Sequence, residues 1–593
     1  MRTTIGPGAF QPHILALAVA LGCTAQAQAV TFNLGEVEGQ LDSALSIGAS
    51  WSMRSADRDL IGPNNGGQGQ SQTADDGRLN FKKGETFSKI FKGIHDLELK
   101  YGDTGVFLRG KYWYDFELKD EERLFKDISD SNRKEGAKSS GAELLDAFVY
   151  HNYALGDSPG SARLGKQVVS WGESTFIGNS INAINPLDAA ALRRPGAEIK
   201  EGLIPVNMFY VSQTLTDSLS AEAFYQLEWD QTVADNCGTF FATSDVSADG
   251  CDRNNTVGSS AIAPLQPIAA ARGQGFEVTS EGVVVPRGGD RDARDSGQFG
   301  LALRWLGDET EYGAYFINYH SRTPVFSTQT AGSGTLAALP GILAATPAPA
   351  RSGLAQSVML GNGSYFLEYP EDIRLYGLSF STSLPTGTAW SGELSYRPNM
   401  PLQLNSTDLT RALLNPIAGG AASPIETAPG AENTGYRRKE VTQVQTTFTH
   451  FIDRVMGASR LTLVGELGAT RIGGLPSSEA DGLRFGRDSV FGSFSQDPHG
   501  FYTSTSWGYR AKATWDYSNV IAGINLRPSL SWSHDVDGYG PVFNEGSKAA
   551  SIGLDAEYRN TYTASLSYTD FFGGEYNSAI DRDFLAISFG VNF

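Results

Sequence analysis

The side chains in this sequence that could act on a small molecule are charged residues placed at every second position between apolar ones. Arg510 and Lys512, for example, alternate with Tyr509, Ala511 and Ala513. This period of two puts the charges on one face of a β-strand and the apolar side chains on the other. A soluble core cannot accept such charges, whereas the wet lumen of a membrane barrel can. The chemistry that the pattern predicts is noncovalent and consists of orienting and selecting solutes.

The same alternation recurs along the chain and predicts a set of lumen-lining residues with both signs in similar numbers. Two uses are open for these charges. They can form ion pairs between neighbouring strands, which lumen charges need in any barrel, or they can set up a transverse field that orients polar solutes. The structural use is the simpler expectation. The predicted lumen-lining residues are Arg109, Lys111, Asp115, Glu117, Glu222, Arg304, Glu393, Arg397, Glu466, Arg510, Lys512, Arg527, Asp555, Glu557 and Arg559.

The segment 170–205 joins two expected strands but is richer in apolar and Ala residues than a solvated loop. Asp188 is placed to cap a short helix that runs through Arg193 and stops before Pro195. Such a segment can fold inward and narrow the barrel; the alternative is an external loop folded back on itself with internal ion pairs. In the inserted form, the predicted constriction consists of Glu173, Asp188, Arg193, Arg194, Glu198, Lys200 and Glu201.

Motifs for catalysis are absent from the sequence. It contains no H-E-x-x-H, and its one G-x-S-x-G match, at 156–160, falls in an expected short turn between two strands and not between a strand and a helix. A Ser-His pair on the barrel wall is the remaining enzymatic alternative. Asp290, Asp292 and Asp295 lie close together, but their spacing does not follow a calcium-binding loop. We expect a solvated charge run there, with no metal and no cofactor. The net charge of -19 argues against a nucleic-acid partner.

The elements that must position these side chains are the strands of a closed, transmembrane, antiparallel β-barrel. Short and long connections alternate almost without exception, as do the periplasmic turns and extracellular loops of outer-membrane barrels. We predict an all-β fold of about 18 strands, with 16 as the alternative, formed by one domain over residues 30–593. The aromatic content of 11% with only 19% charged residues fits strands that are apolar on one side. A large soluble all-β protein is the competing class.

Residues 1–29 predict a secretory signal. Arg2 supplies the positive start, residues 14–21 are apolar, and Ala27-Gln28-Ala29 offers a cleavage site. A buried N-terminal helix is the alternative. No apolar run of 18 residues follows, so no transmembrane helix is expected. An exported chain of this kind is expected in the outer membrane, in contact with lipid and lipopolysaccharide.

Cys237 and Cys251 lie in a polar, Asp-rich stretch of the exported part. The periplasm is oxidising, so a disulfide between them is expected, with two free thiols as the alternative. Two other long loops, 336–350 and 404–417, are unexpectedly apolar, and Ser406 is an expected helix cap in the second. They could plug the mouth, capture a hydrophobic solute, or pack together as a cap over the barrel.

A series of phrases over residues 32–230 carries a resemblance to a known family. They are Phe32-Asn33-Leu34-Gly35, the run from Leu41-Asp42-Ser43 to Trp51, Asp75-Asp76-Gly77 to Asn80, Gly165-Lys166-Gln167 to Gly172-Glu173, Asn185-Pro186-Leu187-Asp188, Arg194-Pro195-Gly196, Lys200-Glu201 and Pro205-Val206. In this order they resemble a family of proteobacterial outer-membrane proteins catalogued only as a domain of unknown function. The resemblance implies a barrel that is often encoded beside an inner-membrane exporter of the resistance-nodulation-division type and a companion periplasmic protein. The neighbouring genes suggest that the family takes part in the transport of hydrophobic molecules.

The C-terminal stretch ends on Phe593, with apolar residues at every second position before it. It resembles the signal that the barrel-assembly machinery recognises, which makes that machinery an expected partner. We therefore expect an outer-membrane channel for small hydrophobic or amphipathic organic molecules, working with periplasmic and inner-membrane transport partners. The alternatives are a general or ion-selective porin, an outer-membrane hydrolase, and a structural or adhesive barrel.

Overall fold

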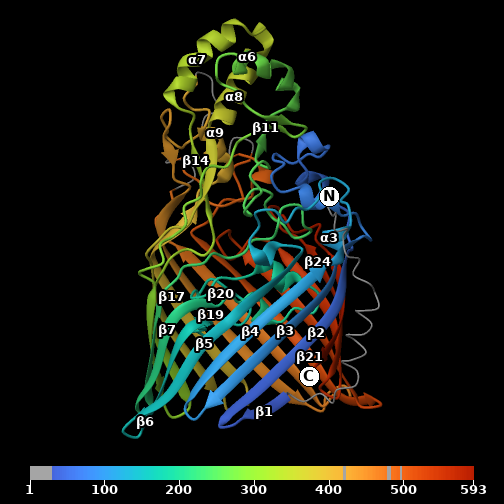
Figure 1. Ribbon diagram of the computed structural model, residues 1–593, viewed down its shortest axis with the longest axis vertical. Helices are drawn as coiled ribbons and strands as arrows, with labels where there is room; N and C mark the ends of the chain where they lie inside the picture. The colour runs from blue at the N-terminus through green and yellow to red at the C-terminus, as the bar shows by residue number, and fades with distance from the viewer. Residues whose placement is uncertain (1–29, 418–422, 477–481, 494–496) are drawn as a thin grey trace, which may run out of the picture.

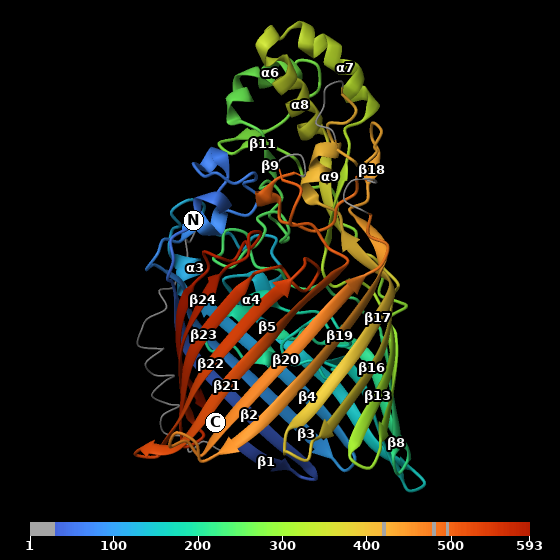
Figure 2. The same cartoon turned by 180° about the vertical axis from the view of Figure 1, so that it is seen from behind.

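The protein is a closed barrel of tilted strands with its long connections gathered at one end (Figure 1, Figure 2). The computed structural model describes residues 30–417, 423–476, 482–493 and 497–593, so the predicted signal at 1–29 lies outside the described residues. The main sheet has 19 strands. Strand β1 pairs only with β2, and the other 18 form a ring that β2 and β25 close. The all-β fold and the count of 18 are confirmed.

The strands of the ring follow the order of the chain around the barrel. They are β2 (Val37–Ser52), β3 (Thr86–Tyr101), β4 (Thr104–Asp115), β5 (Ser140–Leu155), β6 (Ser158–Gln167), β7 (Val206–Thr216), β8 (Leu219–Gln226), β12 (Phe299–Leu306), β13 (Thr310–Tyr319), β16 (Ile373–Ser383), β17 (Ala389–Gln403), β19 (Tyr436–Asp453), β20 (Arg460–Ile472), β21 (Thr505–Ile521), β22 (Ile524–Asp537), β23 (Lys548–Tyr558), β24 (Tyr562–Phe572) and β25 (Phe584–Asn592).

The outer face of the ring is apolar because the period-two pattern turns the large apolar side chains outward. Phe589 on β25 is 54% exposed while its neighbour Ser588 is buried. Aromatic side chains gather near the strand ends: Trp305 and Tyr312 stack beside one short turn, with ring centroids 5.4 Å apart. An apolar belt with aromatic girdles is the surface that a bilayer requires of a barrel. The end with short turns is therefore periplasmic and the end with long loops extracellular.

The extracellular loops fold into a cap above the barrel (Figure 1). The residues of the apolar loop 336–350 contribute to a core that also contains Leu354, Met359 and Leu413, all buried. This corresponds to the packed-cap alternative, and it leaves those apolar side chains out of reach of a solute. The helices and short strands outside the ring are α2 (Asp76–Asn80), α3 (Phe116–Asp120), α4 (Ala189–Arg193), α5 (Ile199–Gly202), α6 (Gln266–Ala270), α7 (Ser333–Ala344), α8 (Arg351–Asn362), α9 (Ser406–Ala412), β9 (Thr256–Val257), β10 (Val278–Thr279), β11 (Gly282–Val284), β14 (Val325–Gln329), β15 (Ser364–Glu368) and β18 (Glu432–Asn433).

The expected cap of the helix in loop 404–417 is wrong by one residue. Asn405, not Ser406, is the N-cap of α9, and its side chain accepts a hydrogen bond from the N–H of Asp408. Both residue types cap helices well, so composition alone does not separate them. Among the described residues, no helix is long and apolar enough to cross a membrane.

Strand β1 (Val30–Leu34) forms a hairpin with the start of β2. Gly35 in the turn has φ +67°, a conformation that glycine adopts without strain. On β2, residues 37–41 pair with β1 and residues 44–52 pair with β25. Since β3 occupies the other edge of β2, β1 and β25 lie one below the other along the same edge.

Candidate functional site in the lumen

The segment 170–205, here called the inserted segment, lies inside the barrel and is held there by charged residues of the wall. Glu466 on β20 is fully buried. Its carboxylate accepts hydrogen bonds from the N–H groups of Thr175, Phe176 and Ile177 at 3.0, 2.6 and 2.8 Å. Three N–H groups converging on one carboxylate satisfy both the buried charge and a stretch of irregular backbone. The wall therefore supplies the hydrogen bonds that the segment does not make within itself.

Two further wall residues, both on β17, form hydrogen bonds with the same part of the inserted segment. The carboxylate of Glu393 accepts a hydrogen bond from the N–H of Glu173. The guanidinium of Arg397, also fully buried, donates to the carbonyl oxygens of Asn179 at 2.9 Å and Ser180 at 2.6 Å. The acid Glu393 thus accepts hydrogen bonds from N–H groups of the inserted segment, and the base Arg397 donates hydrogen bonds to its carbonyl groups. Both signs are needed because the backbone offers donors and acceptors.

The far part of the inserted segment is fastened by two lysines on β3 and β4. Lys111 lies 2.8 Å from Asp188, and Lys92 lies 2.6 Å from Glu201, with both pairs almost fully buried. Asp188 also caps α4, as expected, by accepting from the N–H of Ala191. Removing one partner of such a buried pair leaves an uncompensated charge and costs about 3–5 kcal/mol.

The seven residues predicted to ring a constriction fall into separate groups, of which Glu198, Lys200 and Glu201 are in mutual contact. Arg193 pairs with Asp235 of an extracellular loop at 2.7 Å, and the guanidinium of Arg194 lies 4.3 Å from the centre of the Trp113 ring. Glu173 and Asp188 lie against the wall. Glu198, Lys200 and Glu201 border the two lumen cavities described below, whereas Arg193 and Arg194 border a smaller cavity beside Asp235. Sequence spacing could not separate these roles because they depend on how the segment folds back on itself.

Two of the predicted lumen-lining residues lie elsewhere. Glu117 falls after the end of β4, in α3, where it pairs with Lys89 and Arg123 at 2.6 and 2.9 Å. Arg559 follows the end of β23 in a periplasmic turn, with φ +57°. Both errors come from extending a period-two pattern past the last paired residue of a strand.

The remaining predicted lumen charges lie on the inward faces of their strands, and many form ion pairs. Arg304 lies 2.9 Å from Glu222, and Arg510 lies 2.6 Å from Asp535. The others that occupy inward positions are Arg109, Asp115, Lys512, Arg527, Asp555 and Glu557.

A cavity of about 340 Å³ lies between the inserted segment and the wall formed by the first and last strands. The segment contributes residues 196–198 and Glu201, and β2, β3 and β22–β25 contribute the rest. A second cavity of about 290 Å³ lies toward the periplasmic end and reaches Asn560 and Phe593. Both are lined by Ala44, Ile94 and Glu198, so the two spaces adjoin.

Several contributors to the site were missed from the sequence. Lys92 holds Glu201, and the amide groups of Gln443 and Gln445 donate to the carbonyl oxygens of Gly178 and Ile177 at 2.8 and 3.1 Å. Lys92 follows the same alternation as the predicted lumen charges, so the pattern could have found it. The glutamines carry no charge and give no such sign.

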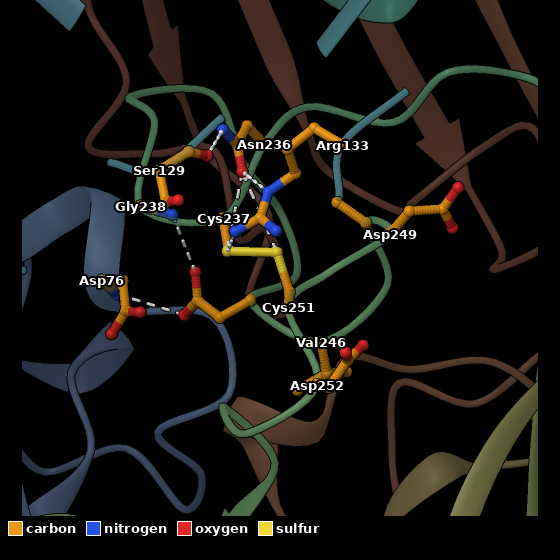
Figure 3. Close-up of a disulfide and its surroundings, with 12 residues drawn as sticks. Asp76, Ser129, Arg133, Asn236, Cys237, Gly238, Val246, Asp249, Cys251 and Asp252 are labelled. Atoms are coloured by element: carbon orange, nitrogen blue, oxygen red, sulfur yellow. Dashed lines mark hydrogen bonds between the residues drawn. A yellow bond between two sulfur atoms is a disulfide. The ribbon is translucent and has the colours of Figure 1, made fainter. Parts of the chain in front are cut away.

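Outside the lumen, the structure joins Cys237 to Cys251 by a disulfide in the extracellular loops (Figure 3). Next to it, carboxylates of Asp75, Asp76 and Asp245 come within 4.8 Å of one another, a grouping that could hold a metal ion. In the structure their partners are protein groups: the Lys126 amino group lies 2.9 Å from Asp76, and the backbone N–H of Asp76 donates to Asp245.

Burial raises the pKa values of these acids. It raises the pKa of Asp75 to about 6, and that of Asp76 to about 8 with a contribution from the Asp245 carboxylate. The pKa of Asp245 is also raised by burial. The group therefore releases protons at a higher pH than exposed aspartates do.

Comparisons with known proteins are limited to family and fold. The model of the family described as "Protein of unknown function (DUF1302)" matches residues 11–593. Among solved structures, OccAB1 of Acinetobacter baumannii has 10% sequence identity and a TM-score of 0.40, covering 96% of this chain and 98% of its own. A BenF-like porin from Pseudomonas fluorescens Pf-5 has 8% identity and a TM-score of 0.40, covering 94% and 98%. The outer membrane channel DcaP of Acinetobacter baumannii has 9% identity and a TM-score of 0.34, covering 95% and 100%.

No curated protein matches the sequence significantly. At the identities and scores of the solved structures, nothing about solute or mechanism transfers to this chain.

Proposed function

This chain belongs to the family described as Protein of unknown function (DUF1302), and from that premise we propose that it is an outer-membrane channel for small amphipathic organic molecules. The observation that carries the proposal is the inserted segment, fastened across the lumen of a closed barrel by Glu466, Glu393 and Arg397. A segment fixed in a lumen narrows the path and brings defined side chains into contact with a passing solute. Those are the means by which channels select.

The lining of the cavity beside the segment favours an amphipathic solute. It combines the small apolar side chains of Ala44 and Ala197 with the acids Asp555 and Glu557. Such a mixed surface suits a molecule with one apolar and one polar end.

The core of the cap buries its own apolar side chains, although a cavity of about 350 Å³ beside it is lined in part by Val257, Phe326 and Leu367. The hydrophobic part of the proposal rests mainly on the family resemblance. The same resemblance supports partners in the periplasm and inner membrane. The C-terminal alternation that ends on Phe593 supports insertion by the barrel-assembly machinery.

A porin for hydrophilic solutes is the second candidate. It is favoured by the inward faces of β24 and β25, which carry small or polar residues such as Thr563, Ser565, Ser588 and Gly590. Small polar walls pass water and ions without binding them. The two candidates differ in whether an apolar group on the solute helps passage.

The purified protein in planar bilayers and in solute-loaded vesicles tests the proposal. We expect discrete conductance steps, and faster passage of benzyl alcohol-sized amphipathic solutes than of sugars of equal size. A variant with 174–200 replaced by a short Gly-Ser linker should conduct several-fold more and lose this discrimination, provided that it still migrates as a folded barrel. No conductance from the wild type would contradict the channel, and an unchanged conductance in the linker variant would contradict the role of the segment. Equal passage of both solute classes in the wild type would favour the porin.

A further inference from the structure

The two adjoining cavities on the periplasmic side of the inserted segment form one space, here called the vestibule. Its roof is residues 196–201 of the segment, and its floor opens at the periplasmic end beside Asn560 and Phe593. The roof is closely fitted: a Cβ on Gly48 of β2 would lie 2.6 Å from Cβ of Pro195, and one on Gly196 would lie 2.6 Å from Oγ of Ser588. The segment thus touches the wall above the vestibule.

The vestibule is acidic. Six carboxylates border it but only three cationic side chains. The acids are Asp42, Asp96, Glu198, Glu201, Asp555 and Glu557, and the cations are Lys92, Lys200 and Arg527.

Each of the three cations has a carboxylate partner. Lys92 lies 2.6 Å from Glu201 and Lys200 lies 3.1 Å from Glu198. Arg527 lies 3.3 Å from Asp516, on the neighbouring strand β21. These pairs leave the cations with little attraction for an anion in the vestibule.

Asp42 and Asp555 differ from the other acids because both are exposed and, among the described residues, no basic side chain lies within ion-pair distance of either. Asp96, by contrast, lies 2.7 Å from Arg109. Arg527 is opposite Asp555 in the strand register but turns to Asp516 and, at 3.7 Å, to Glu557. A carboxylate left without a counter-ion in a partly enclosed space attracts cations, and low-dielectric walls strengthen that attraction.

We infer that the vestibule binds small organic cations that carry an apolar group, reached from the periplasmic side, with Asp555 and Glu557 facing the charge and the small side chains of Ala44 and Ala197 facing the apolar group. The inference rests on the proposed channel function and names the solute class for it. Entry from the periplasm follows from the position of the opening beside Phe593.

The test uses a series of probes with one aromatic group and three charges: benzyltrimethylammonium, benzyl alcohol and benzenesulfonate. Binding to the full-length protein in detergent is measured by titration calorimetry, and block of the bilayer current is measured with each probe added to one side at a time. The variant is Asp555→Asn with Glu557→Gln. Its control is Asp157→Asn with Asp217→Asn, which removes the same charge from two exposed periplasmic turns away from the cavity.

We expect the cation to bind tightest and the anion weakest, and the paired substitution in the vestibule to weaken cation binding about 5- to 10-fold, as the loss of about 1 kcal/mol or slightly more would do. The control should bind like the wild type, and current block should occur from one side only. Equal binding of the three probes, or a vestibule variant that binds like the wild type, would overturn the inference. Binding without any conductance would leave the site standing and contradict the channel instead.

Discussion

The lumen of this barrel has two walls that use polar residues in opposite ways. The fastening wall, made by β3, β4, β17, β19 and β20, points buried charges such as Glu466 and Arg397 at the inserted segment. The open wall, made by β22–β25, carries mainly small inward side chains, and its charges Arg527 and Asp555 remain exposed. The difference shows that a charged side chain on the inward face of a barrel strand is not necessarily exposed to a solute. What decides its role is whether the segment covers it.

The largest expected effect is at the centre of the fastening wall. Glu466→Ala removes the acceptor of three buried N–H groups, each of which costs about 1–3 kcal/mol when left unpaired. The folded barrel should lose its heat resistance on gels at a clearly lower temperature, and its conductance should rise as the segment loosens. Glu466→Gln should be milder, because the amide oxygen still accepts.

The matched substitution on the open wall is Asp555→Asn, which touches no part of the segment. It should leave the free energy of unfolding within about 0.5 kcal/mol of the wild type, so the unfolding temperature on gels should not change. If both substitutions destabilised the barrel equally, the distinction between the two walls would fail.

The disulfide lies in the extracellular loops and belongs to neither wall. Replacing Cys237 and Cys251 by Ser should cost about 3 kcal/mol of local stability in the chain-entropy model. Hydrogen exchange should quicken in residues 231–255, while conductance stays unchanged. A change in conductance would mean that the loops and the lumen are coupled.

The buried acids beside the disulfide give the extracellular loops a pH dependence. The pKa values of Asp75 and Asp76 are raised, to about 6 and about 8, so each stabilises the folded loops in its protonated form. That stability is fully present below about pH 4, the ordinary range of an exposed aspartate, and is lost as the pH rises through about 6 and then about 8. Lys126, Arg78, Asp245 and Glu281 face this group and modulate it.

Protease digestion of the loops between about pH 5 and about pH 9 measures this loss. Cleavage within 55–85 should quicken toward the alkaline end in the wild type. Asp76→Asn should flatten the profile, since the amide does not ionise. A profile as steep in this variant as in the wild type would assign the effect to other groups.

The smallest expected effect on stability is on the open wall itself. Thr563 faces the vestibule, and Thr563→Leu adds bulk there without removing a hydrogen bond that the structure shows. Stability should stay within about 0.5 kcal/mol, while conductance falls by roughly a third to a half because the path narrows. An unchanged conductance would place the path elsewhere in the lumen.

The barrel could be predicted from the sequence because its determinants are local. Alternation on strands such as β25 and the change from short to long connections give the strand count without any tertiary information. The lumen charges were mostly placed on the correct face for the same reason. Glu117 and Arg559 were misplaced because a pattern does not state where pairing stops.

The geometry of the site could not be predicted because it depends on contacts between residues far apart in the chain. The capping of α4 by Asp188 is local and was expected. The hydrogen bond from the N–H of Ile177 to the carboxylate of Glu466 joins positions 289 residues apart, and the sequence around either residue does not predict it. The same holds for the division of the seven segment residues between loops, wall and vestibule.

The shared edge of β2 has a consequence for how the barrel is assembled. The contact of β2 with β25 joins the two ends of the ring, so it has the greatest loop-closure entropy and is among the last to form. The β1–β2 hairpin is a contact between near neighbours and can form in microseconds. In the closed barrel β1 pairs with residues 37–41 of this edge and β25 with residues 44–52, so the edge is paired along almost its whole length and does not offer free backbone groups to another chain. The end of the β1 pairing thus marks where the final strand stops.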